Sequence, residues 1–112
     1  MPNLDRLLSL PGAIAAFEFS DRGELLSSKR TDGGELTDTV LDLLSHVCVA
    51  NISIATMQAR GWERMTGAEG FYPIQGFTMV GLEWSAVTYG NFGVVLTNAD
   101  ADYEVAYAAL GE

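Results

Sequence analysis

The sequence contains few basic residues. Only 6 of its 112 residues are lysine or arginine, against 15 aspartates and glutamates, and the formal net charge is −9. A protein with this charge repels phosphate groups, so we expect neither nucleic acid nor an anionic membrane surface as a partner. The charge favours solubility and says nothing about the fold.

Cysteine is scarce as well. The single cysteine, Cys48, excludes an internal disulfide, which fits a reducing compartment. The first residues lack a basic stretch followed by an apolar run, so we expect no signal peptide. We also expect no stretch long enough to span a membrane. These expectations describe a soluble, cytoplasmic protein.

The same scarcity limits the chemistry that the chain can perform. His46 and Cys48 lie two positions apart, so on a helix their side chains point roughly 160° away from each other and cannot form a catalytic dyad. We expect Cys48 to be a small buried hydrophobe and His46 to be solvated near Asp42. The 12 glycines form no phosphate-binding loop, and no carboxylate pair is placed for acid–base work. We therefore predict no catalytic residue, no metal site and no cofactor.

Nearly half of the residues (48%) are apolar, enough for a single domain over residues 1–112. The hydrophobic periodicity predicts, in order, a helix at 3–10, strands at 13–19 and 24–29, a loop at 31–34, a helix at 37–66, strands at 71–80, 83–89 and 92–97, and a final helix. We expect Asp100 to cap that last helix. Its predicted inner face consists of Tyr103, Ala106, Tyr107 and Leu110. Antiparallel strands in sequence with helices on their faces indicate an α+β layered fold.

The helix predicted at 37–66 is the most informative segment. Thr37 is a suitable N-cap, and the apolar period continues past Gly61, so we expect the helix to end at Gly67. Because a glycine inside a helix costs about 1 kcal/mol relative to alanine, Gly61 suggests that something packs closely against the helix backbone there.

This helix has more apolar surface than one core needs. Its apolar arc is roughly 200° wide, whereas a surface helix needs a stripe of about 100°. At about 45 Å it is also longer than a domain of this size, which is roughly 34 Å across. We therefore predict a homodimer that pairs through this helix. The predicted interface residues are Val40, Leu43, Leu44, Val47, Asn51, Ile54, Gln58 and Trp62.

Asn51 is a polar residue within this apolar arc. A buried amide must find hydrogen-bond partners. Two interpretations remain open. The side chain bonds to sheet or loop backbone of its own chain, or it pairs across a two-fold axis and fixes the register of the dimer.

The order of these elements resembles the roadblock (dynein light chain) family, and it does so over nearly the whole chain. The local segments that carry the resemblance are Leu10-Pro11-Gly12-Ala13-Ile14 and Asp21-Arg22-Gly23-Glu24-Leu25. The likeness to small prokaryotic roadblock-like proteins is closer, through Ala50-Asn51, Met57-Gln58-Ala59, Thr66-Gly67, Gly81 and Gly90-Asn91.

The resemblance implies a five-stranded antiparallel sheet, with the long helix on one face and the terminal helices on the other. It also implies homodimers that pair the long helices and the adjoining edge strand. Some family members bind or regulate small Ras-like GTPases or act as adaptors in motor and signalling complexes. No residue of this chain matches a catalytic or GTPase-contact motif.

These observations predict a non-enzymatic, homodimeric protein-interaction module whose partner is a small GTPase or a metabolic complex. The alternative is a sensor that binds a small apolar ligand between the sheet and the long helix. The dense aromatic residues of the second half leave room for this alternative, although aromatics in strands more often form core or interface. They are Phe71, Tyr72, Phe77, Trp84 and Tyr89.

Overall fold

The computed structural model describes residues 2–31 and 36–112. The elements are α1 (Leu4–Leu8), β1 (Ala13–Phe19), β2 (Leu25–Arg30), α2 (Asp38–Thr66), β3 (Gly76–Val80), β4 (Trp84–Tyr89), β5 (Phe92–Thr97) and α3 (Tyr103–Leu110). Their order and type are those predicted. Most of the loop predicted at 31–34 lies outside the described residues.

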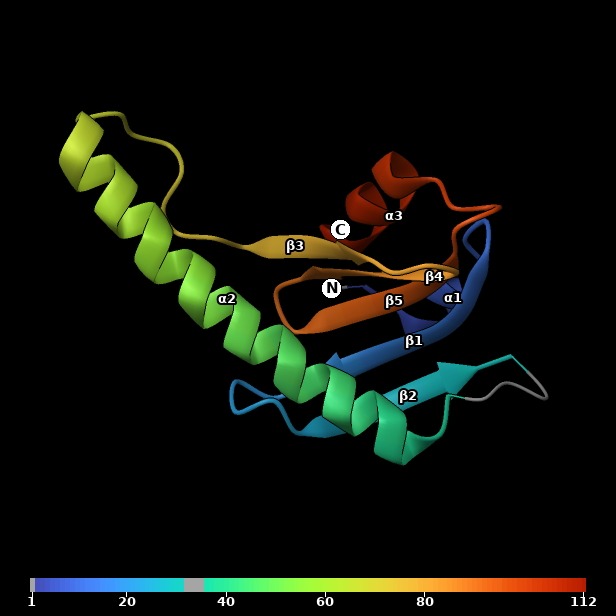
Figure 1. Ribbon diagram of the computed structural model, residues 1–112. Coiled ribbons are helices and arrows are strands. Elements are labelled where there is room, and N and C mark those ends of the chain that lie inside the picture. Colours follow the sequence, from blue (N-terminus) through green and yellow to red (C-terminus); the bar gives the residue numbers. More distant parts are fainter. Residues whose placement is uncertain (1, 32–35) are drawn as a thin grey trace.

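The five strands form one antiparallel sheet in the order β2-β1-β5-β4-β3 (Figure 1). The central pairing of β1 with β5, for example Ala16 opposite Val94, joins an N-terminal strand to the last strand of the chain. A two-residue hairpin connects β4 to β5, as the Gly90-Asn91 pair predicts, and Gly90 has the positive φ of +59° that such turns require. The sheet leaves two edges, β2 and β3.

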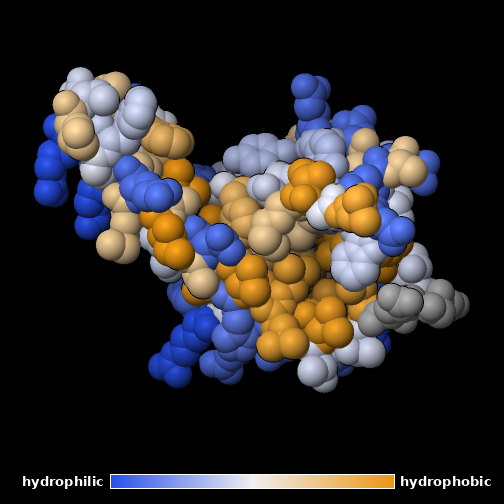
Figure 2. Space-filling model, viewed as in Figure 1, coloured by the Kyte–Doolittle hydropathy of each residue, from blue (hydrophilic) through white to orange (hydrophobic). Residues whose placement is uncertain are grey.

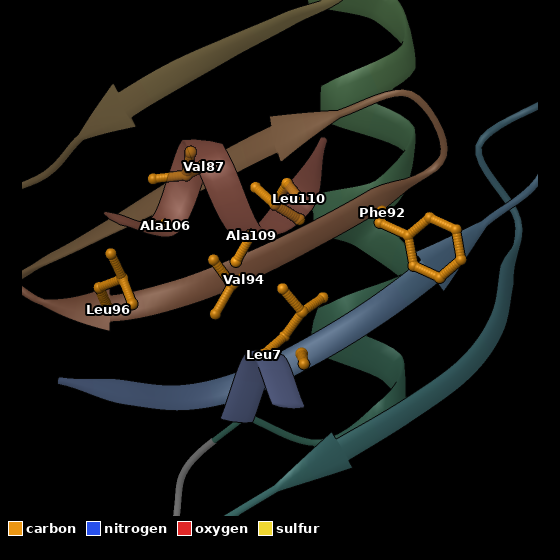
Figure 3. Packing of buried hydrophobic residues seen from close by; sticks show 9 residues of the cluster. Leu7, Val87, Phe92, Val94, Leu96, Ala106, Ala109 and Leu110 are labelled. Atoms are coloured by element: carbon orange, nitrogen blue, oxygen red, sulfur yellow. The ribbon is translucent and has the colours of Figure 1, made fainter. Parts of the chain in front are cut away.

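Helices cover both faces of the sheet. Successive strand residues point to opposite faces, so Ala16 and Val94 pack under α1 and α3, whereas Phe17 and Val95 pack under α2. Figure 3 shows Leu7 of α1 and the inner residues of α3 lying over the side chains of β4 and β5. The layered α+β fold, with the long helix opposite the terminal helices, is therefore confirmed.

The long helix has the predicted ends. The side chain of Thr37 accepts a hydrogen bond from the backbone N–H of Val40 at 3.3 Å. Gly67 ends the helix in the left-handed conformation, with φ +72°. The helix runs through Gly61 without interruption, so the prediction that it continues beyond this glycine is confirmed.

Contacts with the β1–β2 hairpin hold the N-terminal half of α2 in place. The carboxylate of Asp42 accepts a hydrogen bond from the backbone N–H of Leu25 at 2.9 Å. The hydroxyl of Ser28 donates to Asp38 at 3.0 Å. The C-terminal half of α2 projects beyond the sheet (Figure 1). This overhang agrees with the predicted excess length of the helix.

Two predicted boundaries are wrong. The strand β3 begins at Gly76, not at Phe71, because the backbone N–H groups of Phe71 and Tyr72 donate to the Glu63 carboxylate rather than to a neighbouring strand. The helix α3 begins later than predicted, because the N-cap that accepts from the backbone N–H of Val105 is Asp102, not Asp100.

The predicted inner face of α3 is partly wrong. Ala106 and Leu110 are buried as predicted, and Ala109 is buried beside them. Tyr103 and Tyr107 instead lie at the edge of the helix and are exposed. The helix thus rests on two alanines and Leu110, and its two tyrosines flank the contact with the sheet.

Candidate protein-interaction surface

The long helix α2 has two apolar faces, separated by roughly 130° around its axis. The first face packs on β1 and β2 and contains its buried residues: Leu41, Ser45, Cys48 and Ala59. The second face is exposed, and we call it the α2 stripe. Its large apolar members are Val40, Leu43, Val47, Ile54, Met57, Trp62 and Met65.

The α2 stripe is exposed to an extent unusual for a monomer. Leu43 is 62% exposed, Ile54 57% and Met57 74%. In Figure 2, apolar residues gather along α2 and continue onto the sheet surface beside it. Contiguous apolar patches on a soluble protein mark interaction sites.

The stripe includes most of the residues predicted for the dimer interface. Val40, Leu43, Val47, Asn51, Ile54, Gln58 and Trp62 are all exposed. Leu44 is half-buried and packs against the core beneath α2. The contact of these residues with a second copy stays a prediction.

Asn51 is exposed in the single chain, so burial of its amide would require a partner and stays a prediction. Its Nδ2 donates to the backbone carbonyl of Val47 at 2.8 Å, within α2 itself. The bond to its own chain is therefore formed to the helix, not to the sheet or a loop. One N–H of the amide is used in this way, and pairing across a two-fold axis stays a prediction.

The sheet face beside the α2 stripe is also uncovered. A hollow of about 340 Å³ lies between Leu44 and the strands β3 and β4, with Met79, Trp84 and Ala86 among its lining residues. Helices pack with their axes about 8–10 Å apart. A second helix alongside α2 would therefore lie over this hollow.

The projecting end of α2 carries a fixed loop. The Glu63 carboxylate accepts hydrogen bonds from the backbone N–H groups of Phe71 at 2.8 Å and Tyr72 at 3.1 Å. The Arg60 guanidinium donates to the Tyr72 hydroxyl at 2.7 Å and lies 4.8 Å from the centre of its ring. The hydrogen bonds from Tyr72 and Phe71 lower the pKa of Glu63. These contacts hold the exposed Phe71 close to the C-terminal end of α2.

The candidate nucleophile and base have the predicted environments. Cys48 is fully buried, and burial raises the pKa of its thiol to about 12. His46 is exposed, with Nδ1 2.8 Å from the backbone carbonyl oxygen of Asp42. In residues 2–31 and 36–112, no three histidine, cysteine, aspartate or glutamate side chains lie close enough together to hold a metal ion.

Sequence comparison assigns the family. Residues 3–112 match the family model described as "Uncharacterized conserved protein (DUF2173)". The chain belongs to the DUF2173 family. No curated protein matches it in sequence.

Solved structures similar to this DUF2173 protein share its fold. The gliding protein MglB from Thermus thermophilus has a TM-score of 0.76 at 16% identity, covering 97% of this chain and 80% of its own. An MglB structure with a tetrameric arrangement has a TM-score of 0.74 at 16% identity, covering 97% and 79%. A roadblock/LC7 domain from Streptomyces avermitilis has a TM-score of 0.65 at 13% identity, covering 96% and 85%. The DUF2173 protein therefore has the roadblock fold, as the resemblance implied.

One negative prediction about this DUF2173 protein is wrong. By length and composition alone, α2 is long and apolar enough to cross a membrane, since an 18-residue window has a mean hydropathy of 1.6. Only 17% of that window is buried. The sequence prediction attributed the apolar residues of α2 to contacts with the core on one face and with a partner on the other. It therefore did not treat the helix as a possible membrane span.

The predicted ligand position between sheet and helix contains a small open cavity. It has a volume of about 330 Å³ and lies between α2 and the turns at one end of the sheet, with Phe19, Val49 and Ile52 in its lining. Its polar groups are already engaged: Asn91 Nδ2 donates to the carbonyl of Phe19 at 2.8 Å and to Asp21 at 3.0 Å. The volume is near the lower end for a ligand site.

Proposed function

We propose that this protein is a non-enzymatic regulatory adaptor that works as a homodimer, with the α2 stripe of each copy forming the seam. The observation that carries the proposal is the exposed α2 stripe beside the uncovered hollow over β3 and β4. A second α2 would cover both. Full burial of one large apolar side chain contributes roughly 1.5–3 kcal/mol, so several half-exposed ones supply a substantial driving force.

The fold supports the adaptor role. The protein resembles MglB and a roadblock/LC7 domain in structure, and the roadblock resemblance implies binding to small GTPases. We propose a small Ras-like GTPase as the partner. In the described residues, the thiol is buried and no metal cluster forms, so the arrangement favours binding over catalysis.

The dimer is tested by light scattering on purified protein. We expect a dimer at micromolar concentration and a monomer for Leu43→Glu, which places a charge in the α2 stripe near its N-terminal end. Leu26→Glu is the matched control, because Leu26 is similarly exposed but lines a hollow on the opposite face of the sheet. A Leu43→Glu protein that remains dimeric would contradict the seam.

The membrane is the competing cover for the α2 stripe. The proposal includes a cytoplasmic location, so the wild-type protein should stay at the bottom of a gradient when mixed with vesicles of neutral and anionic phospholipid. If the protein is a monomer and floats with the vesicles, the α2 stripe contacts a membrane and does not form a dimer seam.

The GTPase partner is tested with purified Ras-like GTPases of the same host. We expect a stable complex with one of them that depends on the bound nucleotide, and a changed rate of GTP hydrolysis or nucleotide exchange. A dimer that binds none of these GTPases in either nucleotide state would overturn this part of the proposal and leave the seam intact.

The cavity of about 330 Å³ keeps a small-ligand sensor as the second candidate. Thermal shift with a metabolite panel tests it, because a ligand stabilises the folded state by RT ln(1 + [L]/Kd). A shift that Ile52→Trp abolishes would support the sensor, and the absence of any shift would remove it.

A further inference from the structure

The sheet face opposite the α2 stripe is only partly covered by α3. The side chains of β4 on this face pack under α3: the Ser85 hydroxyl lies 2.8 Å from the Tyr103 hydroxyl, and Val87 belongs to the core beneath α3. Directly opposite residues in an antiparallel pair point to the same face. Val80 pairs with Ser85, and Thr78 pairs with Val87. Both β3 side chains therefore point toward the α3 side.

These β3 side chains have no cover in the described chain. Val80 is 65% exposed, and Thr78 is exposed as well. A hollow of about 420 Å³ separates Thr78 from α3, lined by Thr78, Tyr103, Glu104, Tyr107 and Ala108. We call this hollow the α3 groove. It lies on the opposite face of the sheet from the α2 stripe, so both can be occupied at once.

The aromatic wall of the α3 groove is held in place from behind. The hydroxyl of Tyr103 is hydrogen-bonded to Ser85, whose own hydroxyl donates to Asn98 at 2.6 Å. The ring of Tyr107 packs edge-to-face on Tyr89, with the ring centres 5.4 Å apart and an angle of 88°. Both tyrosines nevertheless remain exposed on their groove side. Rigid aromatic side chains with one open face are favourable contact groups, because little entropy is lost when a partner binds.

The charge around the α3 groove has one sign. Residues 65–112 supply β3, β4, β5 and α3, and they contain six acidic residues and no lysine, arginine or histidine. Glu104 lines the groove. The backbone carbonyl of Glu83 accepts from the N–H of Asn98 at 2.9 Å, which brings the β3–β4 turn next to the chain that leads into α3. Arg6 pairs with Glu112, which follows the end of α3 away from Glu104.

We propose that the α3 groove binds an arginine-bearing segment of a partner protein. A guanidinium plane stacks on tyrosine rings and also forms paired hydrogen bonds with a carboxylate such as Glu104. Thr78 and Ala108, which also line the groove, contact the residues between the arginines. An acidic segment is repelled by the same carboxylates. The inference rests on the proposed adaptor role, but it uses residues that the dimer seam does not.

The test is an NMR titration of the ¹⁵N-labelled full chain with a synthetic nonapeptide of alternating arginine and valine. We expect saturable amide shifts concentrated in 76–80 and 103–108, with weaker binding as salt is added. A lysine–valine peptide should bind several-fold more weakly, because lysine lacks the planar fork. A glutamate–valine peptide should produce no shifts in these segments.

Two variants separate the α3 groove from the dimer seam. Tyr107→Ala removes one ring, and Glu104→Lys reverses the charge at an exposed position in the first turn of α3. We expect each to weaken arginine-peptide binding roughly fivefold to tenfold. Leu43→Glu should abolish the dimer and leave peptide binding unchanged. This pattern distinguishes a failed groove from a failed adaptor dimer.

Several outcomes would overturn the proposal. Shifts that map to the α2 stripe, an equal response to the glutamate peptide, or unchanged affinity in Glu104→Lys would each do so. A soluble paramagnetic relaxation agent adds a further check on the free protein. If it fails to reach the amides of 76–80 and 103–108, a second copy already covers the groove, and the arginine segment is not its occupant.

Discussion

Gly23, in the β1–β2 turn, lies directly against the backbone of His46 in α2. A Cβ atom at Gly23 would stand 2.8 Å from the Cα of His46, and Gly23 has φ +88°. The turn can approach the helix this closely only because the residue has no side chain. The contact sets how deeply α2 sits on β1 and β2, and so which of its faces stays exposed.

Gly23→Ala should destabilise the fold by about 3 kcal/mol, since the backbone strain adds to a clash with backbone atoms of α2. Gly90→Ala is the matched control. Gly90 also has a positive φ, +59°, but nothing lies within 4 Å of its added Cβ, so we expect a loss of only about 1 kcal/mol. Urea unfolding measures both. Equal losses for the two variants would show that the turn can move away from α2.

Cys48 should be chemically inert in the folded protein. It is fully buried, and burial raises the pKa of its thiol to about 12, so little thiolate exists at neutral pH. We expect no reaction with a disulfide reagent such as DTNB at about pH 7.5 and complete reaction in guanidinium chloride, with Cys48→Ser as the blank. Rapid labelling of the native state would mean that α2 lifts from the sheet.

The loop at 67–75 should respond to acid through Glu63. Hydrogen bonds from the backbone N–H groups of Tyr72 and Phe71 lower the pKa of this carboxyl below its usual 4.5. Because the folded value lies below the unfolded one, the anchoring is fully present above about pH 4.5 and is lost as the pH falls through the folded pKa. NMR titration of the Glu63 carboxyl carbon should give a midpoint below 4.5. The amide shifts of Phe71 and Tyr72 should follow the same curve.

Glu63→Gln is the control for this titration, since it removes the ionisable group and keeps an acceptor oxygen. In this variant the two amide shifts should no longer change in the acidic range. Amide shifts that titrate as before would mean that another group, and not Glu63, holds the loop.

The order and type of the helices and strands could largely be predicted from the sequence, because short-range patterns determine them. The apolar periodicity predicted that α2 continues through Gly61, and the Gly90-Asn91 pair predicted the β4–β5 hairpin. The start of β3 could not be predicted in this way. It depends on the Glu63 carboxylate, which takes the N–H of Phe71 from eight positions away. At α3, Asp100 and Asp102 are both suitable caps, but the Asp100 carboxylate accepts a hydrogen bond from Thr97 and Asp102 caps the helix.

The two candidate surfaces differ in how far the sequence predicted them. The α2 stripe follows from helical periodicity, because residues on one helix have fixed angular positions. Periodicity could not decide whether Asn51 is covered, since any cover would come from outside the chain. The α3 groove requires the pairing of β3 with β4 and the packing of α3, which bring Thr78 and Tyr107 together. The sequence signal that accompanies the groove is the absence of basic residues after Arg64.

Gly61 provides the last and most direct prediction about the seam. It lies within about 20° of Ile54 around the helix axis, on the exposed α2 stripe, and no atom lies within 4 Å of an added Cβ. A glycine at such a position costs about 1 kcal/mol of helix stability without any gain in the single chain. If a second α2 packs against it, Gly61→Leu should raise the dimer dissociation constant at least about fivefold, since overpacking costs roughly 1–3 kcal/mol. Helicity by circular dichroism should be unchanged or higher.

Sedimentation velocity over a dilution series measures the dissociation constant, with Arg64→Leu as a control in the same turn of the helix. A Gly61→Leu dimer as tight as the wild type would show that the partner does not approach α2 at this point.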